Sequence, residues 1–167
     1  MIYFTKYDSP LGPLLLTAEG GALTGLWMDP QPQPKWEMVQ TDSLPVFSAV
    51  RDWLDRYFRG EAPSTEPIPL HPAGTAFQKQ VWEHLSCIPY GQPVTYGDIA
   101  KELAWRTGKP KMSAQAVGQA VGRNPISILI PCHRVVGAGG KLTGYAGGLD
   151  KKIWLLHHES SHKEETP

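Results

Sequence analysis

Four prolines lie within residues 61–74, and they constrain the fold more than any other feature of the sequence. They are Pro63, Pro67, Pro69 and Pro72. Proline lacks a backbone N–H and cannot continue a helix or a central strand, so this stretch predicts a linker. A chain of 167 residues can form one large domain or two small ones. The linker favours two domains, residues 1–74 and 75–160, followed by a disordered tail at 161–167.

The first half of the chain has the pattern of a small α/β domain. Strand-like runs at residues 2–5, 14–17 and 23–28 are separated by Ser-Pro-Leu-Gly-Pro and Glu-Gly-Gly, which are turn-forming sequences. They predict a β-meander. Residues 29–35 hold three prolines and predict a loop. Apolar residues then recur at helical spacing from Phe47 until Gly60, which predicts a helix packed on the sheet.

The second half predicts several helices and one buried strand. A helix is expected at residues 77–85, and two more should begin at Thr95 and Ser113, whose hydroxyls suit N-caps. These two resemble a helix-turn-helix, although the loop at 104–112 is longer than the usual turn. The third carries an inward stripe of Ala116, Val117, Ala120 and Val121. A near-continuous apolar run at 126–130 predicts a buried strand, and a helix should close the domain at 149–158.

The charges are divided unevenly between the halves of a formally neutral chain. Residues 1–75 carry five Lys and Arg against nine Asp and Glu, whereas residues 76–160 carry ten against five. A basic second half is compatible with a polyanion, although a surplus of five is also common on solvated surfaces. No apolar run is long enough for a membrane span, and the N-terminus lacks the pattern of a signal peptide. We therefore expect a cytoplasmic protein without a membrane partner.

The apolar run ends in Pro131-Cys132-His133-Arg134, the most reactive-looking segment of the chain. Proline should end the strand and present Cys132 at its end. The nucleophilic form of cysteine is the thiolate, so a base is needed at neutral pH; His133 could serve, oriented by a later carboxylate such as Glu159. The residues alone leave a second interpretation open. A lone cysteine on a buried strand is most often an inert small hydrophobe, and neighbouring strand residues point to opposite faces.

The stretch Asn-Pro-Ile-Ser-Ile-Leu-Ile-Pro-Cys-His-Arg-Val-Val at 124–136 carries a family resemblance, together with Gly-Tyr-Ala-Gly-Gly at 144–148 and Trp-Leu-Leu-His-His-Glu at 154–159. It closely resembles the O6-alkylguanine-DNA alkyltransferases, also called methylated-DNA–protein-cysteine methyltransferases. The match runs from Thr75 to Glu159. The resemblance implies a two-domain α+β or α/β protein: a small ribonuclease-H-like N-terminal domain of β-meander and helix, and a winged-helix-like C-terminal domain with a helix-turn-helix and the active-site cysteine.

The resemblance also implies DNA repair by direct reversal, in which an alkyl group moves irreversibly from O6 of guanine to the protein in one turnover. Cys132 would accept the alkyl group, His133 would deprotonate it through a water, and Glu159 would orient His133. Asn124 would stabilise the turn before the cysteine. Tyr96 would contact the rotating phosphate and assist proton delivery to guanine N3. Whether O4-alkylthymine is also accepted, and which alkyl sizes fit, stays open.

The remaining implied residues hold the base and the DNA. Tyr145 would wall the pocket, the carbonyls of Cys132 and Val135 would accept from the exocyclic amine, and the Ala146 amide would donate to O6. Gly147 and Lys152 complete the substrate set. The partner would be double-stranded DNA with an alkylated guanine, bound through its minor groove by a monomer. The implied DNA-binding residues are Gln115, Ala114, Ser113, Gly118, Arg123 and Thr95.

The sequence departs from the family at Gln115, where many members have an arginine that fills the vacated base site. Glutamine can hydrogen-bond the orphaned cytosine but supplies no cation. The long loop, with Arg106, Lys109 and Lys111, either contacts phosphate in compensation or is a solvated basic loop. Some members hold zinc in the N-terminal domain, but no cysteine precedes Cys87 here. We therefore expect no metal and no cofactor, and assign Cys87, which lacks an adjacent base, to packing.

Two other functions remain as alternatives at this point. The chain could be a binding module that only recognises alkylated DNA, or a cysteine hydrolase that uses Cys132, His133 and Glu159. Non-transferring relatives lack the cysteine that is present here. No hydrolase signature is found in the sequence, and hydrolase triads normally draw the base from a distant segment.

Overall fold

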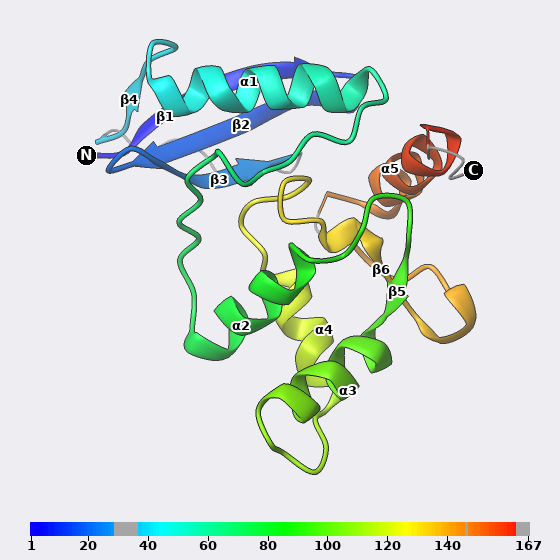
Figure 1. Ribbon diagram of the computed structural model, residues 1–167. Helices are drawn as coiled ribbons and strands as arrows, with labels where there is room; N and C mark the ends of the chain where they lie inside the picture. The colour runs from blue at the N-terminus through cyan, green and yellow to red at the C-terminus, as the bar shows by residue number, and fades with distance from the viewer. Residues whose placement is uncertain (29–36, 146, 163–167) are drawn as a thin grey trace. The chain divides into compact units, whose positions relative to one another are not determined.

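The computed structural model describes residues 1–28, 37–145 and 147–162. The chain forms two compact units (Figure 1): Met1–Ala73 together with Pro125–Leu129, and Gly74–Asn124 together with the chain from Ile130 onward. The short segment at 125–129 therefore belongs with the first unit, although the sequence placed it in the second domain. Its backbone pairs with Leu26 through two hydrogen bonds, from the Leu26 amide to Pro125 and from the Ser127 amide to Leu26.

The first unit is built on the predicted β-meander. Strands β1 (Tyr3–Ser9), β2 (Gly12–Glu19) and β3 (Ala22–Trp27) pair antiparallel, in the sheet order β3-β2-β1-β4. The fourth strand, β4 (Val39–Gln40), pairs parallel with β1 and has no pattern of its own in the sequence. The meander is confirmed, with β1 and β2 longer than the apolar runs. The predicted loop at 29–35 lies outside the described residues.

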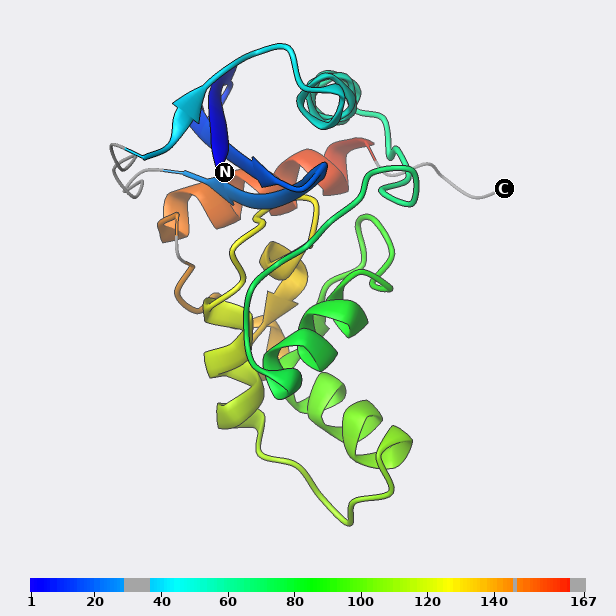
Figure 2. The ribbon, with the colours of Figure 1, turned by 90° about the vertical axis from the view of Figure 1, so that its left-hand side faces the viewer.

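Helix α1 (Pro45–Phe58) covers one face of this sheet, as predicted (Figures 1 and 2). Pro45 stands in its first turn, where the missing N–H costs nothing. The helix is followed by Gly60, whose φ of 96° suits glycine. The proline-rich stretch is not a free linker, because it runs beside β3: the Leu23 amide donates to Pro69 and the Leu23 carbonyl accepts from His71. The buried residues of the helix are Val46, Phe47, Val50, Trp53, Leu54 and Tyr57.

Three helices form the body of the second unit, α2 (Ala76–Leu85), α3 (Tyr96–Arg106) and α4 (Ala114–Gly122). All three were expected from their spacing. The Thr95 hydroxyl accepts from the amide of Asp98, whose carboxylate accepts from Thr95 in return. The three helices pack together, with α3 and α4 as the expected helix pair. The inward stripe on α4 consists of Val117, Ala120 and Val121, while Ala116 is half-exposed.

The predicted strand at residues 126–130 is wrong. Apart from a single bridge between Ile126 and Leu26, this segment forms turns, and Ile128 has a positive φ of 71°. Such a conformation is rare for a β-branched residue and incompatible with a strand. The apolar run correctly indicated burial, since every residue from 124 to 133 is buried. Burial does not require a strand, however, and here buried turns satisfy it.

Short elements complete the second unit. Strands β5 (Val94–Thr95) and β6 (Val135–Val136) pair in parallel, and one-turn 3-10 helices occupy Cys132–Arg134 and Ala138–Gly140. The last helix, α5 (Leu149–His162), was predicted to end at His158. It continues through the first two residues of the predicted tail; the rest of that tail lies outside the described residues. No helix in the described part of the chain is long and apolar enough to cross a membrane.

Candidate active site

Cys132 begins a 3-10 turn rather than ending a strand. The Cys132 amide donates to the Ile130 carbonyl at 2.7 Å, and the Arg134 amide donates to the Pro131 carbonyl at 3.1 Å. Asn124 Nδ2 donates to the same Ile130 carbonyl at 2.8 Å, from the residue that follows α4 and its cap. Asn124 thus joins the end of α4 to the turn and fixes the position of Cys132. The cysteine is 5% exposed and His133 is fully buried.

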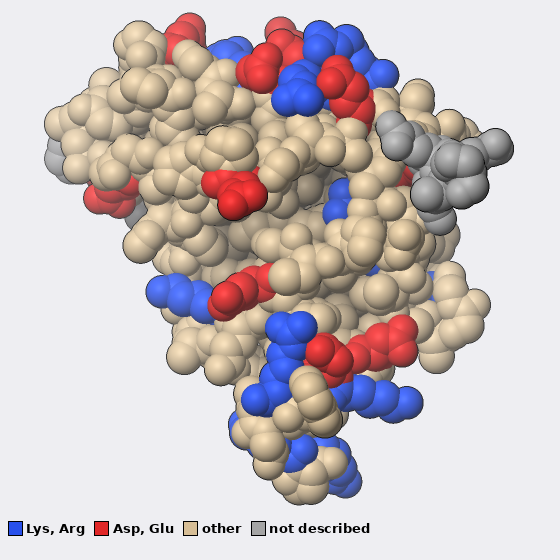
Figure 3. All heavy atoms as spheres, in the orientation of Figure 1, with Lys and Arg blue, Asp and Glu red and all other residues tan. Residues whose placement is uncertain are grey.

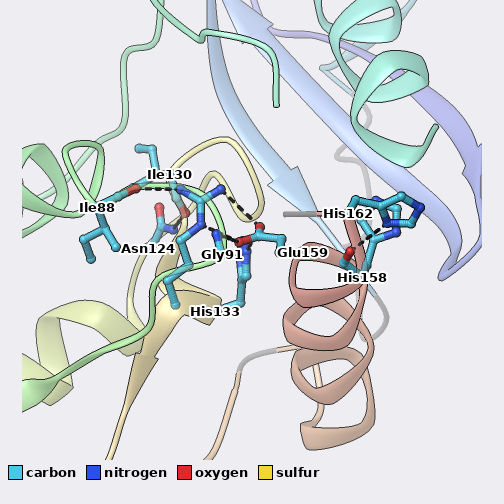
Figure 4. A network of polar contacts seen from close by, with 9 residues as sticks. Ile88, Gly91, Asn124, Ile130, His133, His158, Glu159 and His162 are labelled. Carbon is cyan, nitrogen blue, oxygen red and sulfur yellow. Dashed lines mark hydrogen bonds and ion pairs between the residues drawn. The ribbon is translucent and has the colours of Figure 1, made fainter. Parts of the chain in front are cut away.

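Glu159, from α5, is the centre of a buried hydrogen-bond network (Figure 4). Its Oε2 lies 2.6 Å from His133 Nε2, and its two oxygens accept from Arg134 Nε at 2.8 Å and Nη2 at 3.1 Å. The Gly91 amide donates to Oε1 at 3.1 Å. Burial alone would raise the pKa of Glu159, but the hydrogen bonds and charges of His133 and Arg134 outweigh it and hold the pKa far below its usual range. The carboxylate is therefore ionised.

The protonation state of His133 follows from this partner. Burial lowers the pKa of His133 below its ordinary value, although Glu159 opposes the shift, so the imidazole is neutral at pH 7. An ionised carboxylate can only accept, so Nε2 carries the ring proton and Nδ1 carries the lone pair. Nδ1 is buried and has no hydrogen-bond partner among the described residues. His133, the residue next to Cys132, is thus a neutral imidazole whose basic nitrogen, Nδ1, accepts no hydrogen bond from the described residues.

The thiol of Cys132 needs such a base. Burial raises the pKa of Cys132 above its ordinary value; hydrogen bonds from Asn124 and Tyr145 and the charge of Lys152 oppose the shift without reversing it. The resting cysteine is accordingly a protonated thiol, which is a poor nucleophile. A reaction at its sulfur would require removal of this proton.

A second polar chain lies beside the thiol and includes a residue that sequence reasoning missed. The Tyr96 and Thr143 hydroxyls are 2.8 Å apart, and Lys152 Nζ donates to Thr143 Oγ1 at 3.5 Å. Lys152 is 1% exposed, and burial lowers its pKa, an effect that Cys132 opposes. Thr143 stands 47 residues from Tyr96 in the sequence, so no local spacing could reveal it. Gly118 of α4 faces the Tyr96 ring, at an ordinary contact distance for an added Cβ.

The other predicted substrate residues are placed as follows. Val135 is buried in β6, and Gly147 is half-buried after Tyr145. Ala146 lies outside the described residues.

Four of the predicted DNA-binding residues lie at the two ends of α4. Ser113 caps its N-terminus by accepting from the Ala116 amide at 3.1 Å, and Ala114 and Gln115 follow as exposed residues. Arg123 is exposed at the opposite end, and Thr95 caps α3. A surface along α4 can therefore meet a ligand, with Gln115 in the first turn of the helix and Arg123 at its C-cap.

The packing assigned to Cys87 is wrong. Cys87 is exposed beyond the end of α2, where its Sγ donates to the Glu83 carbonyl at 3.7 Å. A cluster of three or more His, Cys, Asp or Glu side chains able to hold a metal does not occur among the residues described.

Comparisons with known proteins agree with this architecture. Residues 76–161 match the DNA-binding domain of 6-O-methylguanine DNA methyltransferase, and residues 2–72 match its ribonuclease-like domain. The methylated-DNA–protein-cysteine methyltransferase of Haemophilus influenzae is 47% identical over 161 residues, which cover 95% of this chain and 86% of that protein.

Solved structures give the same result. The O6-methylguanine methyltransferase of Mycobacterium tuberculosis is 42% identical with a TM-score of 0.84, over 99% of this chain and 97% of that one. A structure of Mycobacterium tuberculosis OGT in complex with DNA is 41% identical with a TM-score of 0.83, over 98% and 96% of the two chains. Both halves of the sequence and the two-unit architecture thus lead to one conclusion: this chain belongs to the methylated-DNA–protein-cysteine methyltransferase family.

Proposed function

We propose that this protein repairs DNA by moving an alkyl group from O6 of guanine to Sγ of its own Cys132, once per molecule. The observation that carries the assignment is the 2.6 Å contact between His133 Nε2 and Glu159, which leaves the lone pair of a neutral imidazole on Nδ1 of the residue that follows Cys132 in the same turn. Membership of the family supplies the substrate class. Two free thiols, Cys87 and Cys132, fit the reducing cytoplasm.

Activation of the thiol is a proton transfer. The Sγ proton passes through a water to His133 Nδ1, and the resulting imidazolium is stabilised by the ionised Glu159. The thiolate then attacks the alkyl carbon in line: the S–C bond forms, the C–O6 bond breaks, and its electron pair stays on guanine. A thioether is not cleaved by any group in this site, so the protein is consumed.

Guanine must be protonated as it leaves, and we assign this step, at N3, to the Tyr96 hydroxyl. Lys152 donates to Thr143 Oγ1, so the Thr143 proton is free to point at the Tyr96 oxygen. With this orientation the Tyr96 proton remains available to guanine N3. The Thr143 hydroxyl then donates to the phenolate that forms on Tyr96 and stabilises it. The chain from Lys152 through Thr143 to Tyr96 therefore directs a proton toward the substrate.

The target base has to leave the duplex before it can reach Cys132, at a cost of roughly a few kcal/mol that is smaller for a poorly paired lesion. We assign α4 to the minor groove, with Gln115 at its exposed N-terminal end occupying the space of the extruded base. The carbonyls of Cys132 and Val135, the side chain of Tyr145 and the backbone at 146–147 would hold the base. A monomer suffices for these contacts.

The test is the intact mass of the protein after incubation with a duplex that carries one O6-methylguanine. Transfer adds the mass of one methylene, about 14 Da, to the peptide that contains Cys132 and leaves the Cys87 peptide unchanged. Binding without a mass change would indicate a recognition module instead. Repeated turnover of an ester substrate would indicate a cysteine hydrolase.

A further inference from the structure

The end of α3 and the loop that follows it form an exposed basic segment, Trp105 to Met112, which we call the α3–α4 arm. Figure 3 shows Lys and Arg side chains gathered on this part of the second unit, at the far end of α3 and its loop in Figure 1. The arm carries three cations and no acidic residue, against a surplus of five in the whole of residues 76–160. The cations are Arg106, Lys109 and Lys111.

The first half of the arm has a defined conformation. The Lys109 amide donates to the Ala104 carbonyl at 2.9 Å and the Gly108 amide to the Trp105 carbonyl at 3.3 Å, while Gly108 has a φ of 70°. This is the Schellman ending of a helix, which requires a left-handed residue at the position of the glycine. The Thr107 hydroxyl adds a bond to the Leu103 carbonyl at 2.7 Å. The backbone that carries Trp105 and Lys109 therefore has a defined conformation.

The side chains of the arm are available to a partner. Trp105 is 79% exposed, the highest value among the exposed large hydrophobic residues of the described chain. Arg106 pairs with Glu102 on the helix surface, at 2.9 Å. Lys109 and Lys111 are exposed, and neither forms an ion pair or a side-chain hydrogen bond within the described ranges. An aromatic ring together with two unpaired lysines is the composition of a surface that binds a nucleic-acid backbone.

The arm leads directly into the N-terminus of α4. Residues 105–115 are exposed except for half-buried Met112, so the arm and the first turn of α4 form one continuous solvent-facing stretch. Lys111 precedes the cap residue Ser113 by two positions, at most about 7 Å along the chain. Gln115, two residues further, supplies no charge where many family members have an arginine. Position 115 therefore carries no cation, whereas position 111, four residues earlier, carries a lysine.

We propose, on the basis of the proposed function, that the α3–α4 arm binds the phosphate backbone of duplex DNA beside the groove that α4 enters. Lys109 and Lys111 each neutralise one phosphate, and the Trp105 ring packs on the same backbone with its indole N–H toward an oxygen. Gln115 brings no positive charge into the base stack. The arm supplies positive charge from outside the stack instead.

The experiment measures the salt dependence of binding to an undamaged duplex, which cannot react, between 50 and 200 mM NaCl. Each of Lys109→Gln and Lys111→Gln should reduce the slope of log K against log salt by about 0.9, and the double variant by about 1.8. Over this range, wild type should then lose about twelvefold more affinity than the double variant. Trp105→Ala should weaken binding several-fold at every salt concentration with the slope unchanged.

The matched control is Lys6→Gln, which removes one exposed lysine from β1 in the first unit and should leave the slope as in wild type. If the arm variants and the control have the same slope, the proposal is overturned. Thermal unfolding of each variant establishes that the fold is intact. The mass gain of wild-type Cys132 with lesion-containing DNA reports on the proposed function separately, so either idea can fail without the other.

Discussion

Replacing Glu159 by Gln tests the buried network at its centre. The carboxylate accepts four hydrogen bonds, from His133, Arg134 and Gly91, and is 1% exposed. The amide keeps one acceptor oxygen, but its NH2 group faces the donors of Arg134, whose side chain is only 11% exposed. Removing one partner of a buried ion pair costs about 3–5 kcal/mol. For a chain of this size, that loss lowers Tm by roughly 6–20 °C.

The same change should slow alkyl transfer by roughly 10- to 100-fold, because the imidazolium that forms at His133 loses its counter-charge. Transfer is measured in single turnover, with protein in excess over a duplex that carries the lesion. Since Glu159 acts through the imidazole, the double variant His133→Ala with Glu159→Gln should be little slower than His133→Ala alone. Fully additive effects of the two substitutions would refute the relay.

The stability loss has a defined pH dependence. The pKa of Glu159 is lowered in the folded protein, so its contribution is complete above the unfolded pKa of about 4.3 and is lost as the pH falls through the folded value. The difference in Tm between wild type and Glu159→Gln should therefore be full at pH 7 and shrink below about pH 4. Glu102→Gln is the control, because it breaks only the exposed pair with Arg106 and costs less than about 0.5 kcal/mol. Equal Tm values for the two variants would contradict a charged, buried network.

The other predictions concern single side chains. Cys132→Ala should abolish transfer and keep DNA binding in a gel-shift assay, while the exposed Cys87→Ser should transfer normally with little change in Tm; residual transfer in the first variant would identify another acceptor. Because burial lowers the pKa of His133, the rate of transfer should fall only at pH values below the ordinary histidine pKa of about 6.5. A pH–rate profile in which the rate already falls above that pH would be inconsistent with a buried imidazole. Thr143→Val should slow transfer and Thr143→Ser should restore it, since only the serine keeps the hydroxyl that Tyr96 contacts; equal rates would exclude the relay. Gln115→Arg should steepen the salt dependence of duplex binding by about one phosphate equivalent and speed duplex repair, and an unchanged slope would place position 115 away from the DNA.

The features that could be predicted from the sequence depend on short spacings. Thr95 and Ser113 cap their helices because the capping groups lie three residues away in the chain, where the helix geometry itself brings them together. The meander follows in the same way from strand-like runs between turn-forming sequences, and α1 follows from helical periodicity. Cys132 and His133 could be named from the segment around them, through its family resemblance.

The run at 126–130 shows the limit of this kind of reasoning. Its apolar side chains determine that the segment is buried, and it is buried. Its backbone conformation depends on a partner that is distant in the sequence, Leu26, which pairs with Ile126, and on the Asn124 side chain, which bonds to Ile130. A strand and a set of buried turns hide the same side chains from water, so hydrophobicity alone could not separate them.

By itself the sequence determined the family and the caps and faces of most helices, and it predicted the nucleophile and its base, because each is written in a contiguous segment or a spacing of a few residues. Only the tertiary structure decided that Glu159 also neutralises Arg134, that Thr143 joins Tyr96 to Lys152, and that Cys132 sits on a 3-10 turn. The contacts of Glu159 and Thr143 join residues 9 to 47 positions apart. Their energies depend on burial and mutual distance, which the chain acquires only when its elements pack.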